Sequence, residues 1–348
     1  MKTLLLLQTL IQKKDLTQKE AQFLVEEMAK GSVAPAQMAA ALVLLNSKGE
    51  TVDEITGFIK GMRKYMIKTQ NSSVRQAQDK TQNVIDVCGT GGDGKGTFNI
   101  STVVSFVIAG AGVSVAKHGN RAASSKSGSA DVLESLGVHI NLTSEQAERV
   151  LKKVGMVFLF APLFHPAMKY IGPVRKELKM PTVFNMLGPF LNPAGVKKQI
   201  IGVPKIEIAK KLIKVASELN YSHLAIVCGE DGMDEVSISA PTRIFEVCGK
   251  KISSKTIRPE DFGIKKASIK KISGQNPQQN AQILMDIITG KKGPERDVVV
   301  LNSAVGLYVS GKVKSIQEGI YIANESINSG NAKNVLDKLI KETKKYEQ

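Results

Sequence analysis

From Val84 onward the sequence alternates between short apolar runs and longer segments with helical patterning. Strand-like runs are VIDVC (84–88), VSVA (113–116), MVFLFAP (156–162), HLAIVCG (223–229), RIFEV (243–247) and DVVVLN (297–302). Helical patterns occupy 103–112, 205–219, 278–290 and 314–329. Strands that alternate with helices predict an α/β domain on a largely parallel sheet. Ligands of such sheets bind beyond the carboxyl ends of the strands, so the loops that leave the strand-like runs are the expected site.

The first part of the chain has a different pattern. Residues 1–69 are helical in character throughout, and Thr17 and Thr51 each begin a Thr-x-x-Glu capping box ahead of an amphipathic run. The polar stretch 70–83 contains no periodic pattern and is rich in turn-forming residues. We therefore expect a small all-helical domain, a linker at 70–83, and an α/β domain over 84–348.

The charge balance is strongly basic, with a formal net charge of +16. This favours anionic partners, which include phosphorylated small molecules and nucleic acid. However, the lysines are scattered at helical spacing, as on a solvated face, and aromatic residues make up only 5% of the chain. A nucleic-acid partner is therefore not expected, because single-strand binders interleave basic and stacking residues.

The cellular location is predicted from the cysteines and from the absence of targeting signals. The three cysteines are far apart and contain no C-x-x-C pair, which favours free thiols in a reducing cytoplasm. The apolar start MKTLLLLQTLIQKK is interrupted by Gln8 and Thr9 and lacks a small-residue cleavage site, so it is expected to be a helix. No segment approaches the length of a transmembrane helix, and no membrane association is expected.

The segment GTGGDGKGTFNIST (89–102) follows the first strand-like run and is dense in glycine. It lacks the Ser or Thr that a P-loop needs after Lys95, because Gly96 stands there. A dinucleotide fingerprint would need an acidic residue after the next strand, where the chain has Lys117 instead. Glycines let backbone N–H groups surround an anion, and a helix N-terminus adds its dipole. An anion cradle is therefore favoured over an ordinary glycine turn.

Two further loops carry side chains that suit a phosphorylated ligand. KHGNRAASSKSGSAD (117–131) supplies cations and hydroxyls one βα unit after the cradle, although such a loop is often only a solvated turn. GEDGMDEVS (229–237) supplies a group of carboxylates after another strand. Magnesium prefers oxygen ligands, so these carboxylates are candidates for a metal site, with Asp93 and Ser101 as further oxygen donors. Arg175, on a later helix, is suited to bind a carboxylate with two hydrogen bonds.

Together with HPAMKYIGPVRKEL (165–178) and FNMLGPFLNPA (184–194), these motifs resemble the anthranilate phosphoribosyltransferases, in the same order and across nearly the whole chain. The resemblance implies a helical domain joined to a larger α/β domain of the nucleoside phosphorylase and phosphoribosyltransferase type. It implies that about 165–185 packs with the helical domain and that two chains pair through these domains. It also implies transfer of phosphoribose from 5-phosphoribosyl 1-diphosphate to the amine of anthranilate, a step of tryptophan biosynthesis.

The same resemblance assigns the site residues. Contacts with 5-phosphoribosyl 1-diphosphate are expected at Gly89, Gly92, Asp93, Thr97, Asn99, Ile100, Ser101, Thr102, Lys117, His118, Gly119, Asn120, Arg121, Ala122, Ala123, Ser124, Ser125 and Ser129. Asn120 and Arg175 fall where the family contacts anthranilate, with Arg175 at its carboxylate. Two magnesium ions are expected, one at Ser101 and the other at Asp234 and Glu235. No general base is assigned, although His118 is close enough in sequence to be tested.

Two other functions remain open at this point. A pyrimidine-nucleoside phosphorylase shares the predicted architecture and a glycine-rich phosphate loop, but it has no use for an acidic magnesium pair. A non-enzymatic paralogue that binds nucleic acid through its basic surface would show a steep salt dependence of binding.

Overall fold

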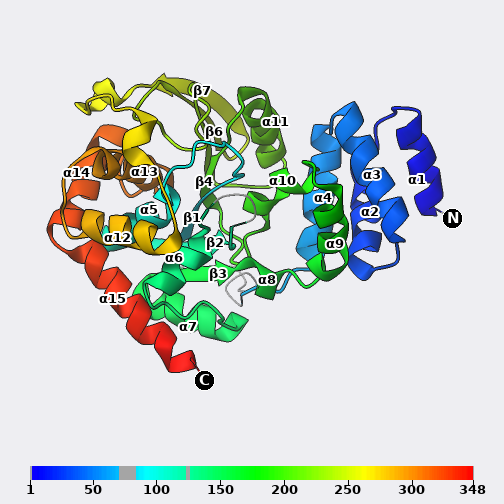
Figure 1. Cartoon of the computed structure of the whole chain (residues 1–348). Coiled ribbons are helices and arrows are strands. Elements are labelled where there is room, and N and C mark those ends of the chain that lie inside the picture. Colours follow the sequence, from blue (N-terminus) through cyan, green and yellow to red (C-terminus); the bar gives the residue numbers. More distant parts are fainter. Residues whose placement is uncertain (1, 70–83, 123–125, 348) are drawn as a thin grey trace.

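The computed structural model describes residues 2–69, 84–122 and 126–347. The chain begins with a compact group of helices at one side of the molecule (Figure 1). These are α1 (Lys2–Ile11), α2 (Gln18–Lys30), α3 (Pro35–Lys48) and α4 (Val52–Lys64). Thr17 and Thr51 each accept a hydrogen bond from the backbone N–H of the Glu three residues on, and that Glu side chain bonds back to the capping residue. Both predicted capping boxes are thus confirmed.

A later segment packs with these helices. The helix α9 (Met168–Leu178) contacts α2 and α3, and its buried Ile171 and Val174 share a core with Leu24 and Leu42. Short elements flank it: α8 (Ala161–Phe164), α10 (Phe184–Leu187) and a 3-10 turn (Gly188–Leu191). The assignment of about 165–185 to the helical domain stays a prediction. The expected linker at 70–83 lies outside the described residues.

The rest of the chain forms a seven-stranded sheet in the order β3-β2-β1-β4-β5-β6-β7. The strands are β1 (Val84–Gly89), β2 (Ser114–Gly119), β3 (Met156–Phe160), β4 (Lys198–Gly202), β5 (His223–Gly229), β6 (Thr242–Cys248) and β7 (Lys251–Ile257). All neighbours from β3 to β5 pair in parallel, whereas β6 and β7 are antiparallel. The predicted fold class, a helical domain beside an α/β domain with a mostly parallel sheet, is confirmed.

Helices cover both faces of the sheet (Figure 1). The helices of the α/β part are α5 (Ile100–Gly110), α6 (Ser129–Ser135), α7 (Ser144–Val154), α11 (Ile206–Ser217), α12 (Pro277–Ile288), α13 (Pro294–Ser310), α14 (Ile316–Asn328) and α15 (Asn331–Thr343). Successive residues of a strand point to opposite faces. Accordingly, Ile200 of β4 joins the core under α5 and α13, while Ile201 joins the core shared with α11 and the N-terminal helices. The sheet therefore links the two hydrophobic cores.

One predicted strand was wrong. DVVVLN (297–302) lies inside α13, which is buried on nearly every side. A helix without a polar face looks like a buried strand over a short window, because neither shows a period. Pro294 at the first turn and the left-handed Gly311 (φ 76°) mark its ends. The strands β4 and β7 and the helix α15 were not predicted.

The remaining bulk expectations concern membranes and thiols. Within the described part of the chain, no helix is long and apolar enough to cross a bilayer. Cys88, Cys228 and Cys248 are all free thiols.

Candidate active site

The loops after β1 and β5 meet at the carboxyl edge of the sheet, although β4 separates the two strands. The acidic turn after β5 folds back over β4, and the backbone N–H of Gly91 donates to Asp234 Oδ2 at 3.0 Å. This approach requires glycine at two strand ends. A Cβ atom at Gly89 would lie 2.6 Å from Asp234 Oδ2, and one at Gly202 would collide with the backbone carbonyl oxygen of Asp234.

The glycine loop has the geometry of an anion-binding nest. Gly91, Gly92, Gly94 and Gly96 have φ values of 71°, 81°, 67° and 65°, a region that other residues rarely adopt. No atom lies within 4 Å of a Cβ built at any of these glycines, so their backbone conformation rather than crowding requires them. The loop ends at α5, whose N-terminus adds a partial positive charge.

Beneath this loop lies a buried lysine. Lys117, at the end of β2, is 2% exposed. Its Nζ donates to the backbone carbonyl of Val87 at 2.8 Å and to Ser101 Oγ at 3.0 Å. Burial lowers the pKa of Lys117, and the carboxylate of Asp86 opposes this shift. Lys117 therefore connects the ends of β1 and β2 to the first turn of α5 and orients the hydroxyl of Ser101.

The predicted metal residues converge next to this lysine. Burial, with Asp93 close by, raises the pKa of Asp234 to about 7. Burial and the neighbouring Asp234 raise the pKa of Glu235 to about 8, which Lys117 only partly opposes. Asp93 Oδ2 is buried and lacks a hydrogen-bond partner among the described residues. A bound cation would stabilise the ionised form of these buried, closely spaced carboxylates.

The oxygen donors fit magnesium better than a softer metal. Across the ranges 2–69, 84–122 and 126–347, no group of three or more His, Cys, Asp and Glu side chains could hold a metal ion by itself. A magnesium ion commonly takes one or two carboxylates and completes its shell with water and substrate phosphate. Asp234 and Glu235, with Ser101 and Asp93, are the residues that would hold it.

The acidic turn is itself held by side chains outside the site. Ser237 Oγ donates to Asp231 Oδ2 at 2.6 Å, which closes the turn. Asn302 of α13 pairs with the backbone of Val236, donating to its carbonyl and accepting from its N–H, both at 2.9 Å. The position of Glu235 thus depends on a residue far away in the sequence.

The loop after β2 is also held by carboxylates. Asp131 accepts the N–H groups of Ala122 and Gly128 at 3.1 and 2.9 Å. Arg121 pairs with Asp131 and Glu134. Ser129 Oγ donates to the Asn120 carbonyl at 3.3 Å. The expected contacts Ala123, Ser124 and Ser125 lie outside the described residues.

Four of the expected contacts take part in the packing around the site. Ile100 and Thr102 are fully buried, so only their backbone at the start of α5 is available to a ligand. Thr97 forms a β-bridge with Ser273. Gly119 packs against Phe158, where a Cβ atom would lie 2.7 Å from the ring.

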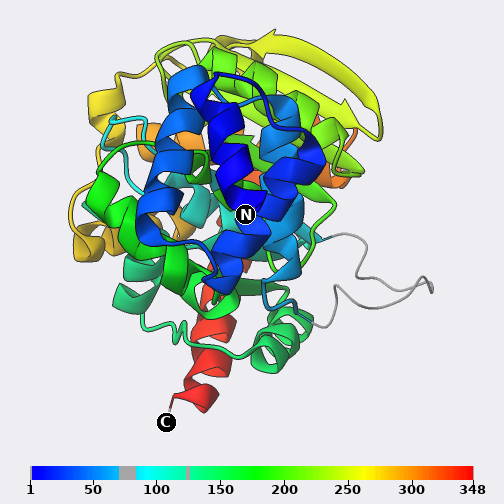
Figure 2. The ribbon, with the colours of Figure 1, turned by 90° about the vertical axis from the view of Figure 1, so that its right-hand side faces the viewer.

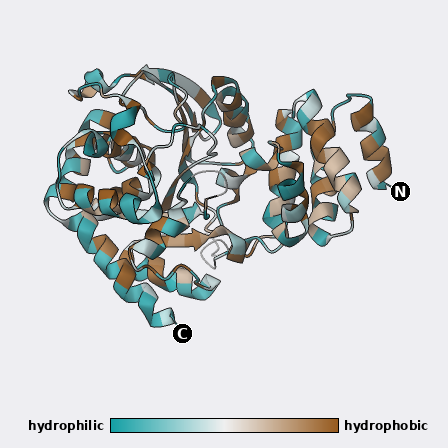
Figure 3. Cartoon of the chain, in the orientation of Figure 1, coloured by the Kyte–Doolittle hydropathy of each residue, from teal (hydrophilic) through white to brown (hydrophobic). Residues whose placement is uncertain are grey.

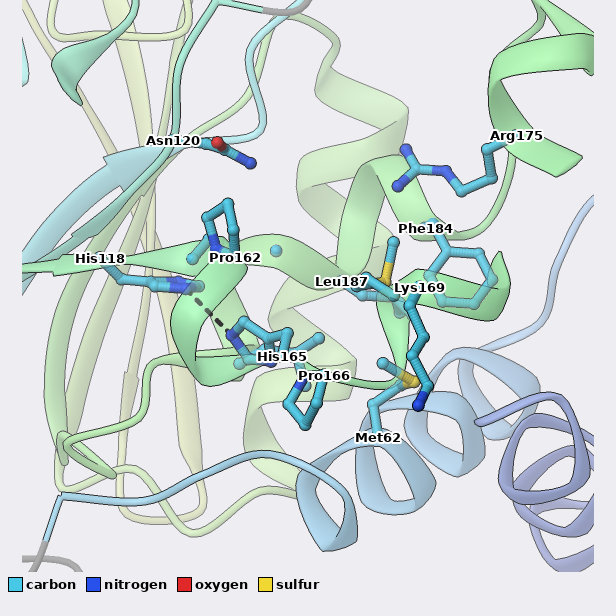
Figure 4. A pocket seen from close by; sticks show the side chains of 14 residues that line it. Met62, His118, Asn120, Pro162, His165, Pro166, Lys169, Arg175, Phe184 and Leu187 are labelled. Carbon is cyan, nitrogen blue, oxygen red and sulfur yellow. Dashed lines mark hydrogen bonds between the residues drawn. The ribbon is translucent and has the colours of Figure 1, made fainter. Parts of the chain in front are cut away.

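A cavity of about 580 Å³ opens between the helical domain and the end of β2 (Figure 4). Its walls are largely apolar, with polar groups at a few points. The lining residues are Met62, His118, Asn120, Ala161, Pro162, His165, Pro166, Met168, Lys169, Arg175, Phe184, Leu187, Gly188 and Leu191. Asn120 and Arg175 point toward each other across it.

Arg175 lacks a carboxylate partner among the described residues. Its guanidinium carbon lies 5.4 Å from the centre of the Phe184 ring, and burial lowers the pKa of the guanidinium. An arginine remains charged even so. An anion that enters the cavity would therefore be its counter-charge.

A histidine pair forms the other polar wall. His118 Nε2 and His165 Nε2 lie 3.1 Å apart, so one ring donates and the other accepts. Burial lowers the pKa of His118 to about 3 and that of His165 to about 4, which leaves both rings neutral at pH 7. His165 was not among the predicted site residues, and neither were Met62 and Phe184. Only the position of His165 next to the predicted Arg175 helix could have suggested it.

A glycine nest suited to phosphate, a group of buried carboxylates suited to magnesium and a largely apolar cavity that contains an arginine are the features expected of an enzyme that transfers a phosphorylated sugar. The comparisons agree with this class. The model of the glycosyl transferase family, a/b domain, matches residues 81–333, and that of the glycosyl transferase family, helical bundle domain, matches residues 5–66.

Curated relatives define the family more closely. Anthranilate phosphoribosyltransferase of Methanobrevibacter smithii is 46% identical over 94% of this chain and 96% of its own length. The enzyme of the same name from Symbiobacterium thermophilum is 44% identical over 96% of each chain. The chain belongs to the anthranilate phosphoribosyltransferase family.

Solved structures show the same architecture. Anthranilate phosphoribosyltransferase from Thermus thermophilus is 36% identical, with a TM-score of 0.89 over 99% of this chain and 100% of that one. The Saccharomyces cerevisiae enzyme in complex with PRPP and Mg is 28% identical, with a TM-score of 0.90 over 99% and 98%.

Proposed function

We propose that this chain transfers the 5-phosphoribosyl group from 5-phosphoribosyl 1-diphosphate to the amine of anthranilate and releases diphosphate, with magnesium. The observation that carries the proposal is the juxtaposition of two subsites. The glycine nest and acidic turn lie at the sheet edge, and the end of β2 leads from them into the cavity with Arg175. A solved relative binds PRPP and Mg, and another structure of that enzyme binds 4-fluoroanthranilate.

The residues at the sheet edge would act on the departing diphosphate. Its loss leaves a cationic sugar carbon, so the protein must stabilise negative charge on the leaving group. The backbone N–H groups of the glycine loop and the N-terminus of α5 are fixed in place for this task. Magnesium, when bound, would neutralise further charge on the diphosphate. Asp234, Glu235 and Ser101 are proposed as its protein ligands, and two ions remain our prediction.

The cavity would bind and orient anthranilate. Arg175 would hold its carboxylate through two parallel hydrogen bonds, Asn120 would bind from the opposite side, and the apolar walls would cover the ring. The neutral rings of His118 and His165 do not repel the cationic sugar carbon. An aromatic amine is already uncharged at pH 7, so orientation rather than a strong base is required. No side chain is assigned as general base.

We also propose that the chain acts as a homodimer in the cytoplasm. Leu4, Leu5 and Ile11 of α1 and Val43 of α3 are exposed. Helix α1 lies on the side of the helical domain that faces away from the sheet (Figure 2), and much of its ribbon has the hydrophobic colour (Figure 3). Large exposed apolar side chains that cluster in this way are typical of interfaces. Light scattering of the full chain should give twice the chain mass, and Leu5→Asp should give a monomer. A monomeric native chain would contradict the assembly.

The decisive experiment mixes the chain with anthranilate, 5-phosphoribosyl 1-diphosphate and magnesium and follows the loss of anthranilate. We expect turnover that requires both substrates and the metal. Phosphorolysis of a pyrimidine nucleoside is measured in parallel and should be absent, because that reaction makes no use of the acidic turn. Lack of turnover together with tight, salt-sensitive binding of DNA would replace the enzyme by the nucleic-acid-binding alternative.

A further inference from the structure

A buried asparagine of α12 contacts the start of α5. Asn280 is 3% exposed, and its Nδ2 donates to Asn99 Oδ1 at 2.9 Å. Its own Oδ1 accepts the backbone N–H of Gln275 at 2.9 Å. A buried amide that both donates and accepts in this way is held in one orientation. Asn280 does not line the cavity and belongs to none of the loops that carry the proposed contacts.

Asn99 extends this contact to the second phosphate loop. Its Nδ2 donates to the backbone carbonyl of Ser127 at 3.1 Å. The Asn99 oxygen therefore faces Asn280, and the nitrogen faces Ser127. If the amide were reversed, its oxygen would face the Ser127 carbonyl and its NH₂ would face that of Asn280, so both hydrogen bonds would be lost.

This orientation matters for an anionic ligand. A side-chain amide has two N–H groups, and Ser127 uses one of them. Asn99 is the N-cap residue of α5, and its second side-chain N–H remains as a donor next to the glycine nest. A phosphate oxygen can accept from an N–H but not from a carbonyl oxygen. The hydrogen bond from Asn280 thus occupies the oxygen of the Asn99 amide and leaves the NH₂ group on the side where one N–H reaches Ser127 and the other can serve the ligand.

The chain around Asn280 is joined to the glycine loop at other points. The backbone N–H of Gly274 donates to the Gly96 carbonyl at 2.8 Å, and that of Phe98 donates to Ile272 at 3.1 Å. A Cβ atom at Gly274 would lie 2.6 Å from the Thr97 carbonyl oxygen, so the two segments are in close contact. Because Asn280 Oδ1 accepts the backbone N–H of Gln275, Asn280 also holds the end of the segment 272–275, which contacts the glycine loop.

We propose that Asn280 is a positioning residue for the diphosphate subsite, which holds Asn99 in the orientation that presents an N–H to the substrate. It ties together the glycine loop, the second loop and the segment before α12, and it does not touch the substrate itself. The proposal rests on the proposed function, since it assumes that the nest binds 5-phosphoribosyl 1-diphosphate.

The test measures kcat and both KM values for Asn280→Ala and Asn280→Asp, with calorimetric binding of 5-phosphoribosyl 1-diphosphate in magnesium. Asn280→Asp keeps the size and the acceptor for Gln275 but loses the donor to Asn99. For both variants we expect the Kd and KM for 5-phosphoribosyl 1-diphosphate to rise roughly tenfold. This factor corresponds to the lower range of free energies for the loss of a buried hydrogen bond. The KM for anthranilate should stay within about twofold, because Arg175 and the cavity are not disturbed.

A double-mutant cycle separates positioning from general loosening of the fold. If Asn280 acts through Asn99, the variant Asn99→Ala/Asn280→Ala should bind 5-phosphoribosyl 1-diphosphate no more weakly than Asn99→Ala alone. The matched control is Asn324→Ala, which removes a partner of the buried Arg296 and changes no residue of the loops that carry the proposed contacts. It should lower the Tm as Asn280→Ala does and leave the Kd unchanged.

Several results would overturn the assignment. These are wild-type binding by Asn280→Asp, equal rises in both KM values, or effects of the two substitutions that multiply in the double variant. Calorimetry is independent of turnover, so an inactive wild-type chain that still binds the diphosphate would refute the proposed reaction and leave the Asn280 comparison valid. A wild-type chain that does not bind the diphosphate would overturn both.

Discussion

Arg175 offers the sharpest test of the proposed anthranilate subsite. The substitution Arg175→Ala removes the half-buried guanidinium from a largely apolar cavity in which the described residues provide it with no carboxylate. Truncating one member of a buried, hydrogen-bonded charge pair costs about 2 to 5 kcal/mol. Because Arg175 is only half-buried, solvent screens the pair, and the lower half of that range applies, about 2 to 3 kcal/mol.

This free energy converts to a rise of roughly 30- to 150-fold in the KM for anthranilate, at a factor of ten for each 1.4 kcal/mol. Arg175→Lys keeps the charge but loses the paired geometry, so its KM should rise less, by about tenfold. The KM for 5-phosphoribosyl 1-diphosphate should change little with either variant, since the nest lies at the sheet edge.

The assay follows the loss of anthranilate fluorescence. The KM for anthranilate is measured at saturating 5-phosphoribosyl 1-diphosphate, and the KM for 5-phosphoribosyl 1-diphosphate is measured at saturating anthranilate. Lys176→Ala is the matched control, because Lys176 is the next residue on α9 and is exposed. It should match the wild type in both KM values. An equal rise in both KM values for Arg175→Ala, or a rise as large for Lys176→Ala, would show that Arg175 does not bind the carboxylate.

Three further predictions concern the acidic turn. Asp234→Asn with Glu235→Gln should raise the magnesium concentration needed for half-maximal activity, and an unchanged requirement would remove these residues from the metal site. The pKa of Asp234 is raised from 3.8 to about 7 and that of Glu235 from 4.5 to about 8. Without metal, the folded chain therefore holds more protons than the unfolded chain in this window, and these groups should make the Tm fall as the pH rises from about 4 to about 8. Magnesium should reverse that fall, and a Tm profile unaltered by the double substitution would contradict the assignment. Gly202→Ala should displace the Asp234 backbone and weaken magnesium binding, measured by calorimetry, whereas Gly172→Ala, which meets no atom within 4 Å, should bind as the wild type does. Equal magnesium affinity for both variants would mean that the turn does not need its close contact with β4.

Much of the fold could be predicted because its signals are local. A capping box at Thr17 depends on residues three positions apart, and β5 was predicted at its observed bounds because a short apolar run between polar turns has few other solutions. The prediction of a strand at 297–302 was wrong for the same reason. A window of six residues does not reveal that the segment continues as a buried helix from Pro294 to Ser310.

The sequence alone indicated a loop suited to an anion. Glycine permits the left-handed φ values that the loop adopts between Gly91 and Gly96, so an anion cradle after the first strand could be predicted from the residue types alone. Tertiary structure decided what surrounds that nest. His165 meets His118, and Asn280 meets Asn99, only because separate helices are packed onto one sheet. Backbone conformation is set by near neighbours along the chain, whereas these side-chain contacts join residues that the sequence separates widely and only the packed core brings within hydrogen-bonding distance.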